Sequence, residues 1–170
     1  MYLNAKNVLK NLWINPEFKH FGKPAQVGYD LTLLAVSKIG SGNHTLYVDR
    51  SVVDKRAYAP YPLYINPENK DQQLWLFDPG VYSLTFHQGC KLSSNVKAEI
   101  VHRSSLLRMG VEIKSAVYDP GFKTDKMGAV MIVHNLMQIE YGARVAQILM
   151  SETQECVEYD GQWQDKKDLK

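Results

Sequence analysis

Residues 99–147 place arginine, hydroxyl and carboxylate side chains in short runs that could bind and cleave a phosphate chain. The first run is Val101-His102-Arg103-Ser104-Ser105-Leu106-Leu107-Arg108. An arginine followed by two serines offers a planar cationic fork and short hydroxyl donors, which together suit phosphate oxygens. The same run also fits an exposed strand end, or a helix start with serine as its cap, so by itself it does not decide between chemistry and structure.

Asp119 stands at a predicted turn in a second run, Ala116-Val117-Tyr118-Asp119-Pro120-Gly121-Phe122. Its carboxylate can orient and deprotonate an attacking water molecule. The plain alternative is a turn without chemistry, because Phe77-Asp78-Pro79-Gly80 repeats Asp-Pro-Gly where only a turn signal is visible. A third run, Gly142-Ala143-Arg144-Val145-Ala146-Gln147, predicts on its own a turn that enters a strand.

Several familiar chemistries have no motif in the sequence. H-E-x-x-H is absent, and so are the H-x-E and P-C-x-x-C elements of zinc deaminases, the Walker A loop and G-x-G-x-x-G. His20, His44 and His87 stand alone, so we interpret them as surface or core histidines and not as metal ligands.

The scaffold that must position these residues is predicted to be mainly β. Short runs rich in Val, Ile, Tyr, Thr and Leu alternate with Gly, Pro, Asn and Asp turn signals, at residues 29–36, 74–77, 81–86, 96–102, 129–134 and 145–150. Such spacing favours a β-barrel or jelly-roll. One short helix is expected from Ala5 to Trp13, with Asn4 as N-cap. Residues 38–71 are expected to form long loops and arms that cross the barrel.

The bulk composition fits one domain. The chain has 170 residues, of which 45% are hydrophobic and 22% charged, and a net charge of +2 is too small to mark a nucleic-acid or membrane binder. No signal peptide or membrane span is visible, and Cys90 and Cys156 form no C-x-x-C. We therefore expect a cytoplasmic protein without direct nucleic-acid binding. A single disulfide between Cys90 and Cys156 remains an open alternative. Residues 1–158 would form the domain and 159–170 a polar tail.

Taken in order, these runs resemble the motifs of the dUTPase and dCTP deaminase superfamily. The first motif resembles Val27-Gly28-Tyr29-Asp30-Leu31, preceded by Trp13-Ile14-Asn15-Pro16, which is similar to the I-N-P of deaminases. The second is the Arg103-Ser104-Ser105 run. The third is close to the deaminase I-D-P-G-aromatic, and the fourth, ending at Gln147, is close to G-x-R-I-A-Q. The segment from Tyr159 to Gln164 resembles the deaminase C-terminal segment that folds over the nucleotide, so 159–170 would be a lid.

This resemblance implies a distorted jelly-roll or β-barrel with a short N-terminal helix, and hydrolysis of dUTP to dUMP and pyrophosphate. Asp119 would activate the water that attacks the α-phosphorus, and Phe122 would stack beneath the deoxyribose. Mg²⁺ would be carried by the triphosphate, with Asp30 in an indirect supporting place. A homotrimer with active sites between subunits is implied as well. The remaining substrate contacts would come from Arg103, Ser104, Ser105, Arg108, Gln147 and Gln164 for phosphate, and from the main chain near Ser115 and Val117 for uracil.

The position of the deaminase glutamate decides between two activities. dCTP deaminases resemble V-L-E-F-Y-N in the strand after the third motif, where this chain has Ala129-Val130-Met131-Ile132-Val133-His134-Asn135. The glutamate position falls on Ile132 or Val133, which favours dUTP hydrolysis, since deamination needs a carboxylate to relay protons. The alternatives are a deaminase or bifunctional enzyme using Asp125 or Glu112, and an inactive nucleotide-binding regulator. The loop from Lys123 to Met127 is longer than is typical of deaminases.

Overall fold

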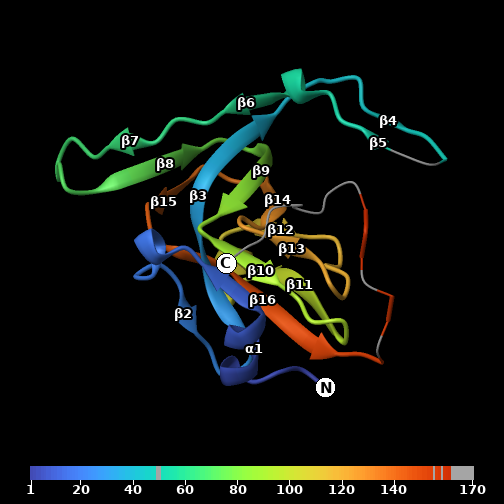
Figure 1. Ribbon diagram of the computed structural model, residues 1–170. Helices are drawn as coiled ribbons and strands as arrows, with labels where there is room; N and C mark the ends of the chain where they lie inside the picture. Colours follow the sequence, from blue (N-terminus) through green and yellow to red (C-terminus); the bar gives the residue numbers. More distant parts are fainter. Residues whose placement is uncertain (49–50, 155, 158, 162–170) are drawn as a thin grey trace.

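A closed barrel of six antiparallel strands forms the body of the computed structural model, which describes residues 1–48, 51–154, 156–157 and 159–161 (Figure 1). Each strand pairs with the next, and β16 returns to pair with β3, so the sheet closes on itself. The predicted β-barrel is therefore confirmed. In order around the barrel the strands are β3 (Tyr29–Ile39), β9 (Gly80–Phe86), β14 (Gly128–Val133), β12 (Val111–Lys114), β11 (Val96–His102) and β16 (Arg144–Glu152).

Alternating side chains fill the barrel. On β9, Tyr82, Leu84 and Phe86 are buried while the side chains between them are exposed or half-buried. β11 and β16 repeat this pattern, and their register places Ala98 opposite Met150. Because successive side chains of a strand point to opposite faces, each strand contributes one apolar row to a common core. Burial of these rows is the main contribution to the stability of the fold.

The N-terminal helix is shorter than predicted. α1 (Ala5–Asn11) begins at the expected N-cap, where the Asn4 side chain accepts a hydrogen bond from the Asn7 amide at 3.1 Å. The expectation that it runs to Trp13 is wrong, because β1 (Leu12–Ile14) pairs with β10 (Gln88–Lys91) instead. The strand ladder supplies the backbone partners that another helical turn would have supplied, a tertiary effect that local pattern does not report.

Residues 40–48 and 51–71 form arms that contain short paired strands as well as loops, whereas Lys38 and Ile39, also expected in the loops, extend β3. The arms leave one end of the barrel on opposite sides (Figure 1). The hairpin of β4 (Thr45–Leu46) and β5 (Ser51–Val52) leads through η2 (Lys55–Ala57) into the second arm. That arm contains β6 (Tyr58–Pro60), β7 (Tyr64–Ile65) and β8 (Gln73–Phe77), the last of which also pairs with β15 (Met137–Glu140).

The smaller elements lie around the barrel. They are η1 (Pro16–Phe18), β2 (Lys23–Pro24) on the edge of β3, α2 (Ser104–Arg108) after β11, and β13 (Lys123–Thr124) on β10. Cys90 is buried and Cys156 exposed, and both are free thiols. Among the described residues, no helix has the length and apolar character that crossing a bilayer requires.

Gly28 is expected to be irreplaceable at the entry to β3. Its φ is +88°, and a Cβ there would lie 2.1 Å from the Ile148 carbonyl oxygen on β16. Gly28→Ala should therefore lower the free energy of unfolding by about 3 kcal/mol, since it combines a strained backbone with overlap at the barrel seam. Urea unfolding measures this, with Gly40→Ala as control, because its Cβ would meet only the Ala57 carbonyl at 3.8 Å. Equal losses in the two variants would contradict the prediction.

Candidate active site

A cleft with a volume of about 770 Å³ opens between the barrel and the segment from Val53 to Tyr58, where the first arm leads into the second. This size suits a small-molecule ligand, for which roughly 300–1,000 Å³ is usual. Its walls come from Val53, Lys55 and Tyr58, from Ser83 on β9, from the end of β12 with the turn that follows, from the start of β14, and from Tyr159. The lining residues are Val53, Lys55, Tyr58, Ser83, Lys114, Ser115, Ala116, Val117, Tyr118, Asp119, Phe122, Gly128, Ala129, Val130 and Tyr159.

The turn that carries Asp119 is fixed by backbone hydrogen bonds. Tyr118 and Ala98 of β11 exchange two, at 2.7 and 3.0 Å, and the Phe122 amide donates to the Asp119 carbonyl at 3.1 Å. Gly121 closes the turn with a φ of +80°, a conformation that favours glycine. Among the described residues, the exposed Asp119 carboxylate has no hydrogen-bond or ion-pair partner. Both of its oxygens are therefore open to accept a hydrogen bond from water.

The Phe122 ring lines the cleft near Asp119. The ring is 9% exposed and lies between the rings of Tyr118 and Tyr159, with both centroid distances at 5.3 Å. The Tyr159 amide donates to the Pro120 carbonyl at 3.0 Å, which holds the start of the expected tail against the Asp119 turn. A ring packed on both sides keeps its orientation and presents a fixed apolar surface to the cleft.

Ser115 and Val117 line the same wall. The Ser115 hydroxyl accepts a hydrogen bond from the Ile100 amide at 2.9 Å, so the side chain takes over a backbone partner where the β11–β12 ladder ends. Ala116 and Val117 are exposed, and no backbone hydrogen bond joins either to another described residue. Their amide and carbonyl groups are therefore available to a ligand. Four of the predicted site residues thus share one cleft: Ser115, Val117, Asp119 and Phe122.

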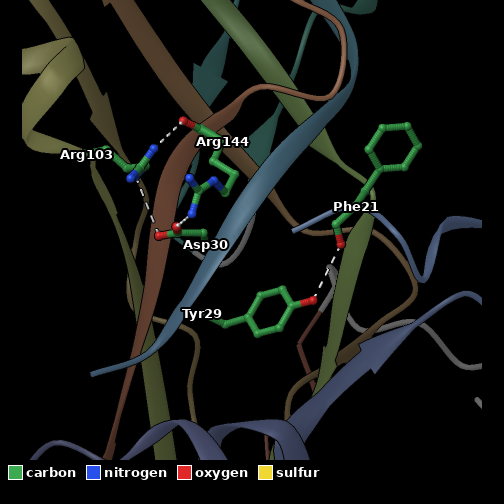
Figure 2. A network of polar contacts seen from close by, with 5 residues as sticks. All are labelled: Phe21, Tyr29, Asp30, Arg103 and Arg144. Atoms are coloured by element: carbon green, nitrogen blue, oxygen red, sulfur yellow. Dashed lines mark hydrogen bonds and ion pairs between the residues drawn. The ribbon is translucent and has the colours of Figure 1, made fainter. Parts of the chain in front are cut away.

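The other predicted residues that the structure describes lie outside this cleft, toward the far end of β11. Asp30 is buried on β3 between two arginines (Figure 2). One Asp30 oxygen lies 2.9 Å from Arg144 Nη1 and the other 3.6 Å from Arg103 Nε, while Arg103 Nη1 donates to the Arg144 carbonyl at 3.3 Å. Two guanidinium groups against one carboxylate leave a net positive charge, and both arginines are partly exposed. This arrangement, here called the arginine pair, suits an anion.

Arg144 was missed by sequence reasoning, although it belongs to the fourth motif. A register shift in the β16–β3 ladder falls between Arg144 and Ala146, and it leaves Val145 and Ala146 buried in succession. This irregularity turns Arg144 out of the core and onto Asp30. Its place in the fourth motif was the available signal, because its contact with Asp30 comes from a distant strand.

The remaining phosphate candidates that the structure describes lie on α2, which follows Arg103, and on β16, which begins at Arg144. Ser104, Ser105 and Arg108 are exposed on α2, and Gln147 on β16 lies opposite Val101 and Asp30 in the barrel register. Both forms of the structural interpretation of the run from Val101 to Arg108 hold, the strand end and the helix start, since β11 ends at His102 and α2 begins at Ser104. The expectation of a serine cap is wrong, because Arg103 occupies the N-cap and makes no side-chain cap hydrogen bond. Gln164 lies outside the described residues.

Asp119 is the sole carboxylate among the described residues that line the cleft. Ile132 and Val133 are the two positions where the deaminase glutamate could fall. Ile132 lies beyond Val130 on the outward face of β14, and Val133 is in the core. The Glu112 carboxylate contacts Lys114 Nζ at 2.7 Å and His134 Nε2 at 3.4 Å, and the Lys114 hydrogen bond, followed by that of His134, holds the pKa of Glu112 below its usual value. Asp125 does not line the cleft either. Neither candidate for a replacement deaminase glutamate is thus placed for that role.

Residues 9–153 match the model of the dCTP deaminase-like family. The chain belongs to this family. Related proteins of the dCTP deaminase-like family include a deoxyuridine 5′-triphosphate nucleotidohydrolase from Methanocaldococcus jannaschii, which is 37% identical over 86% of this chain and 87% of the relative. A probable deoxyuridine 5′-triphosphate nucleotidohydrolase from Aeropyrum pernix is 31% identical over 73% of this chain and 86% of that protein.

The dCTP deaminase-like fold is also seen in a solved structure. The crystal structure of 2′-deoxycytidine 5′-triphosphate deaminase from Agrobacterium tumefaciens superposes with a TM-score of 0.57 at 16% identity. The match covers 91% of this chain but 49% of the deaminase chain, so this chain spans about half the length of that protein. At this identity the likeness shows a shared fold and leaves activity to the site residues.

Proposed function

We propose that this protein hydrolyses dUTP to dUMP and pyrophosphate. The observation that carries the proposal is that the cleft pairs one unpartnered carboxylate, Asp119, with a β14 wall that offers no second carboxylate among the described residues. Hydrolysis of a phosphoanhydride needs a base, a fixed phosphate chain and cations. Deamination also needs an acidic group beside the amino group of the cytosine ring. The relatives named as nucleotidohydrolases support the same choice.

In the proposed reaction, Asp119 accepts a proton from water as the water oxygen bonds to the α-phosphorus. The bond from that phosphorus to the bridging oxygen of the β-phosphate breaks, and pyrophosphate leaves with the electron pair. Phe122 would lie beneath the deoxyribose, where its bulk leaves no room for a 2′-hydroxyl. The exposed main chain at Ser115 to Val117 would read the uracil edge with one donor and one acceptor.

The triphosphate would be held by the arginine pair together with Ser104, Ser105, Arg108 and Gln147. Arg103 follows β11 five residues after Ala98, which bridges to Tyr118, so the two halves are separated by roughly 17 Å along the strand. We therefore propose that each active site joins the cleft of one copy to the arginine pair of another, as in the homotrimer expected by resemblance. Residues 159–170, including Gln164, would close over the nucleotide, and the Tyr159 contacts support that path.

Magnesium would be bound through the triphosphate, where it neutralises charge on the phosphoryl oxygens. The described residues contain no group of three or more His, Cys, Asp and Glu side chains placed to hold a metal ion. Both Asp30 oxygens already face guanidinium groups, so Asp30 fits the role of orienting the arginines better than that of a direct ligand. Its indirect role near the metal stays a prediction, as does the cytoplasmic location.

Incubation with dUTP and with dCTP in separate magnesium-containing reactions tests the proposal. We expect pyrophosphate from dUTP and no ammonia from dCTP, because the cleft provides a base for water but no proton relay at the pyrimidine amino position. Both products are followed over time, with a chelator control for the metal requirement. Ammonia release from dCTP would indicate a deaminase, and dUTP binding without pyrophosphate would indicate an inactive nucleotide-binding regulator.

A further inference from the structure

The Tyr118 side chain joins two walls of the cleft. Its hydroxyl donates a hydrogen bond to the Gly128 carbonyl and accepts one from the Gly128 amide at 3.2 Å. A single side chain thereby engages both backbone groups of one residue. Gly128 is the first residue of β14, and with Ala129 and Val130 it forms the wall that faces the Asp119 turn.

The backbone of Tyr118 is anchored as firmly as its hydroxyl. Its amide and carbonyl both bond to Ala98 on β11, and its ring packs against Phe122. Asp119 is the next residue, so the position of its carboxylate follows the position of Tyr118. The hydroxyl is therefore the link that relates the Asp119 turn directly to β14.

The chain between the two walls is held to a third strand. Residues 119–127 connect Tyr118 to Gly128, and within them β13 pairs with β10. The Met127 amide also donates to the Gln88 carbonyl at 2.9 Å. These contacts fix the connection to β10, and the Tyr118 hydroxyl adds a direct hydrogen bond between the Asp119 turn and β14.

The chemistry of the hydroxyl suits a permanent contact. Burial is the main cause that raises the pKa of Tyr118 well above its usual value, so the group stays protonated and keeps donating throughout the neutral range. Since the hydroxyl proton and a lone pair are both engaged at Gly128, the group is suited to hold the walls together and not to transfer protons.

We propose that Tyr118 is a positioning residue that sets the distance between the Asp119 carboxylate and the β14 wall. This inference rests on the proposed dUTP hydrolysis, in which Asp119 must meet a water molecule aligned on the α-phosphorus. Displacement of a reacting group by about 1 Å can cost a hundredfold in rate. Loss of the link is therefore expected to change the chemical step more than the binding of nucleotide.

Tyr118→Phe tests this, because it removes the hydroxyl and keeps the ring against Phe122. Tyr82→Phe is the matched control, since the buried Tyr82 hydroxyl donates to the Asp78 carbonyl at 2.8 Å and does not line the cleft. For Tyr118→Phe we expect kcat for dUTP to fall by about tenfold or more with KM within about threefold. In the Tyr82→Phe control, kcat should stay within about twofold of the wild type. This should hold even where the control loses as much melting temperature as Tyr118→Phe does.

Amide hydrogen exchange gives a second readout that does not depend on turnover. The Gly128 amide should exchange at least about tenfold faster in Tyr118→Phe than in the wild type, with no change in the control. An unchanged kcat, or an unchanged exchange rate at Gly128, overturns the positioning role while the wild type remains active. A wild type that releases no pyrophosphate from dUTP instead refutes the proposed function, and with it the catalytic part of this inference.

Discussion

Asp119→Asn is expected to lower kcat for dUTP by roughly a thousandfold while nucleotide binding stays close to that of the wild type. The amide keeps the shape of the side chain and the turn, whose hydrogen bonds come from the backbone. It cannot accept the proton of the attacking water. Single-turnover pyrophosphate release measures the loss, and calorimetry with a non-hydrolysable α,β-imido analogue of dUTP measures binding.

The other Asp-Pro-Gly turn of the chain, at Asp78, supplies the control for this experiment. Asp78→Asn makes the same chemical change at an exposed turn outside the cleft, where the Asp78 carboxylate lies 4.0 Å from Lys38 Nζ. It should leave kcat unchanged. If Asp119→Asn retained wild-type turnover, another group would have to activate the water, and the assignment of Asp119 would be wrong.

Arg103→Ala is expected to reduce kcat/KM for dUTP by roughly a hundredfold. The substitution removes a cation proposed to hold the triphosphate, and it leaves the buried Asp30 carboxylate with Arg144 as its remaining arginine partner. Steady-state kinetics with dUTP measures the effect. Lys97→Ala is the control, because it removes an exposed cation from the same strand, β11. Equal activities in the two variants would show that Arg103 does not touch the triphosphate.

Mixing the two inactive variants tests whether active sites form between chains. In oligomers co-expressed from Asp119→Asn and Arg103→Ala, an intact Asp119 and an intact Arg103 meet at about one site in four if they come from different subunits. Activity should then return to about a quarter of the wild-type value. Sites built within single chains would contain one defect each, so the mixture would stay inactive.

Five of the six barrel strands were predictable from runs rich in β-forming residues, and β12 was not among the predicted runs. β11 runs over the predicted residues 96–102, and the other five predicted runs lie on strands apart from His134, which follows the end of β14. Failures occurred where a distant partner decided the outcome. Pairing with β10 converted Leu12 to Ile14 into a strand, and short pairings organised the arms beyond residue 40, although neither segment alternates clearly.

The site was predictable where one short run builds it. Ser115, Val117, Asp119 and Phe122 lie within eight residues, so the turn that fixes one also fixes the others. Contributions from distant segments were not visible. Lys55 and Tyr58 reach the cleft through the path of the arm, and Arg144 reaches Asp30 through the ladder between β16 and β3. No local pattern encodes such contacts.

The irregularity in the β16–β3 ladder makes the spacing between Arg144 and Ala146 matter as well as the identity of Arg144. Arg144 leaves the core because one extra residue shifts the phase of β16 at this point. One more residue inserted between Arg144 and Ala146 would reverse the face of the strand that Arg144 occupies, whereas a substitution at Ala143 would leave the phase unchanged. Among related sequences, the number of residues between Arg144 and Ala146 should therefore stay fixed, and position 143, the free position of the motif, should vary.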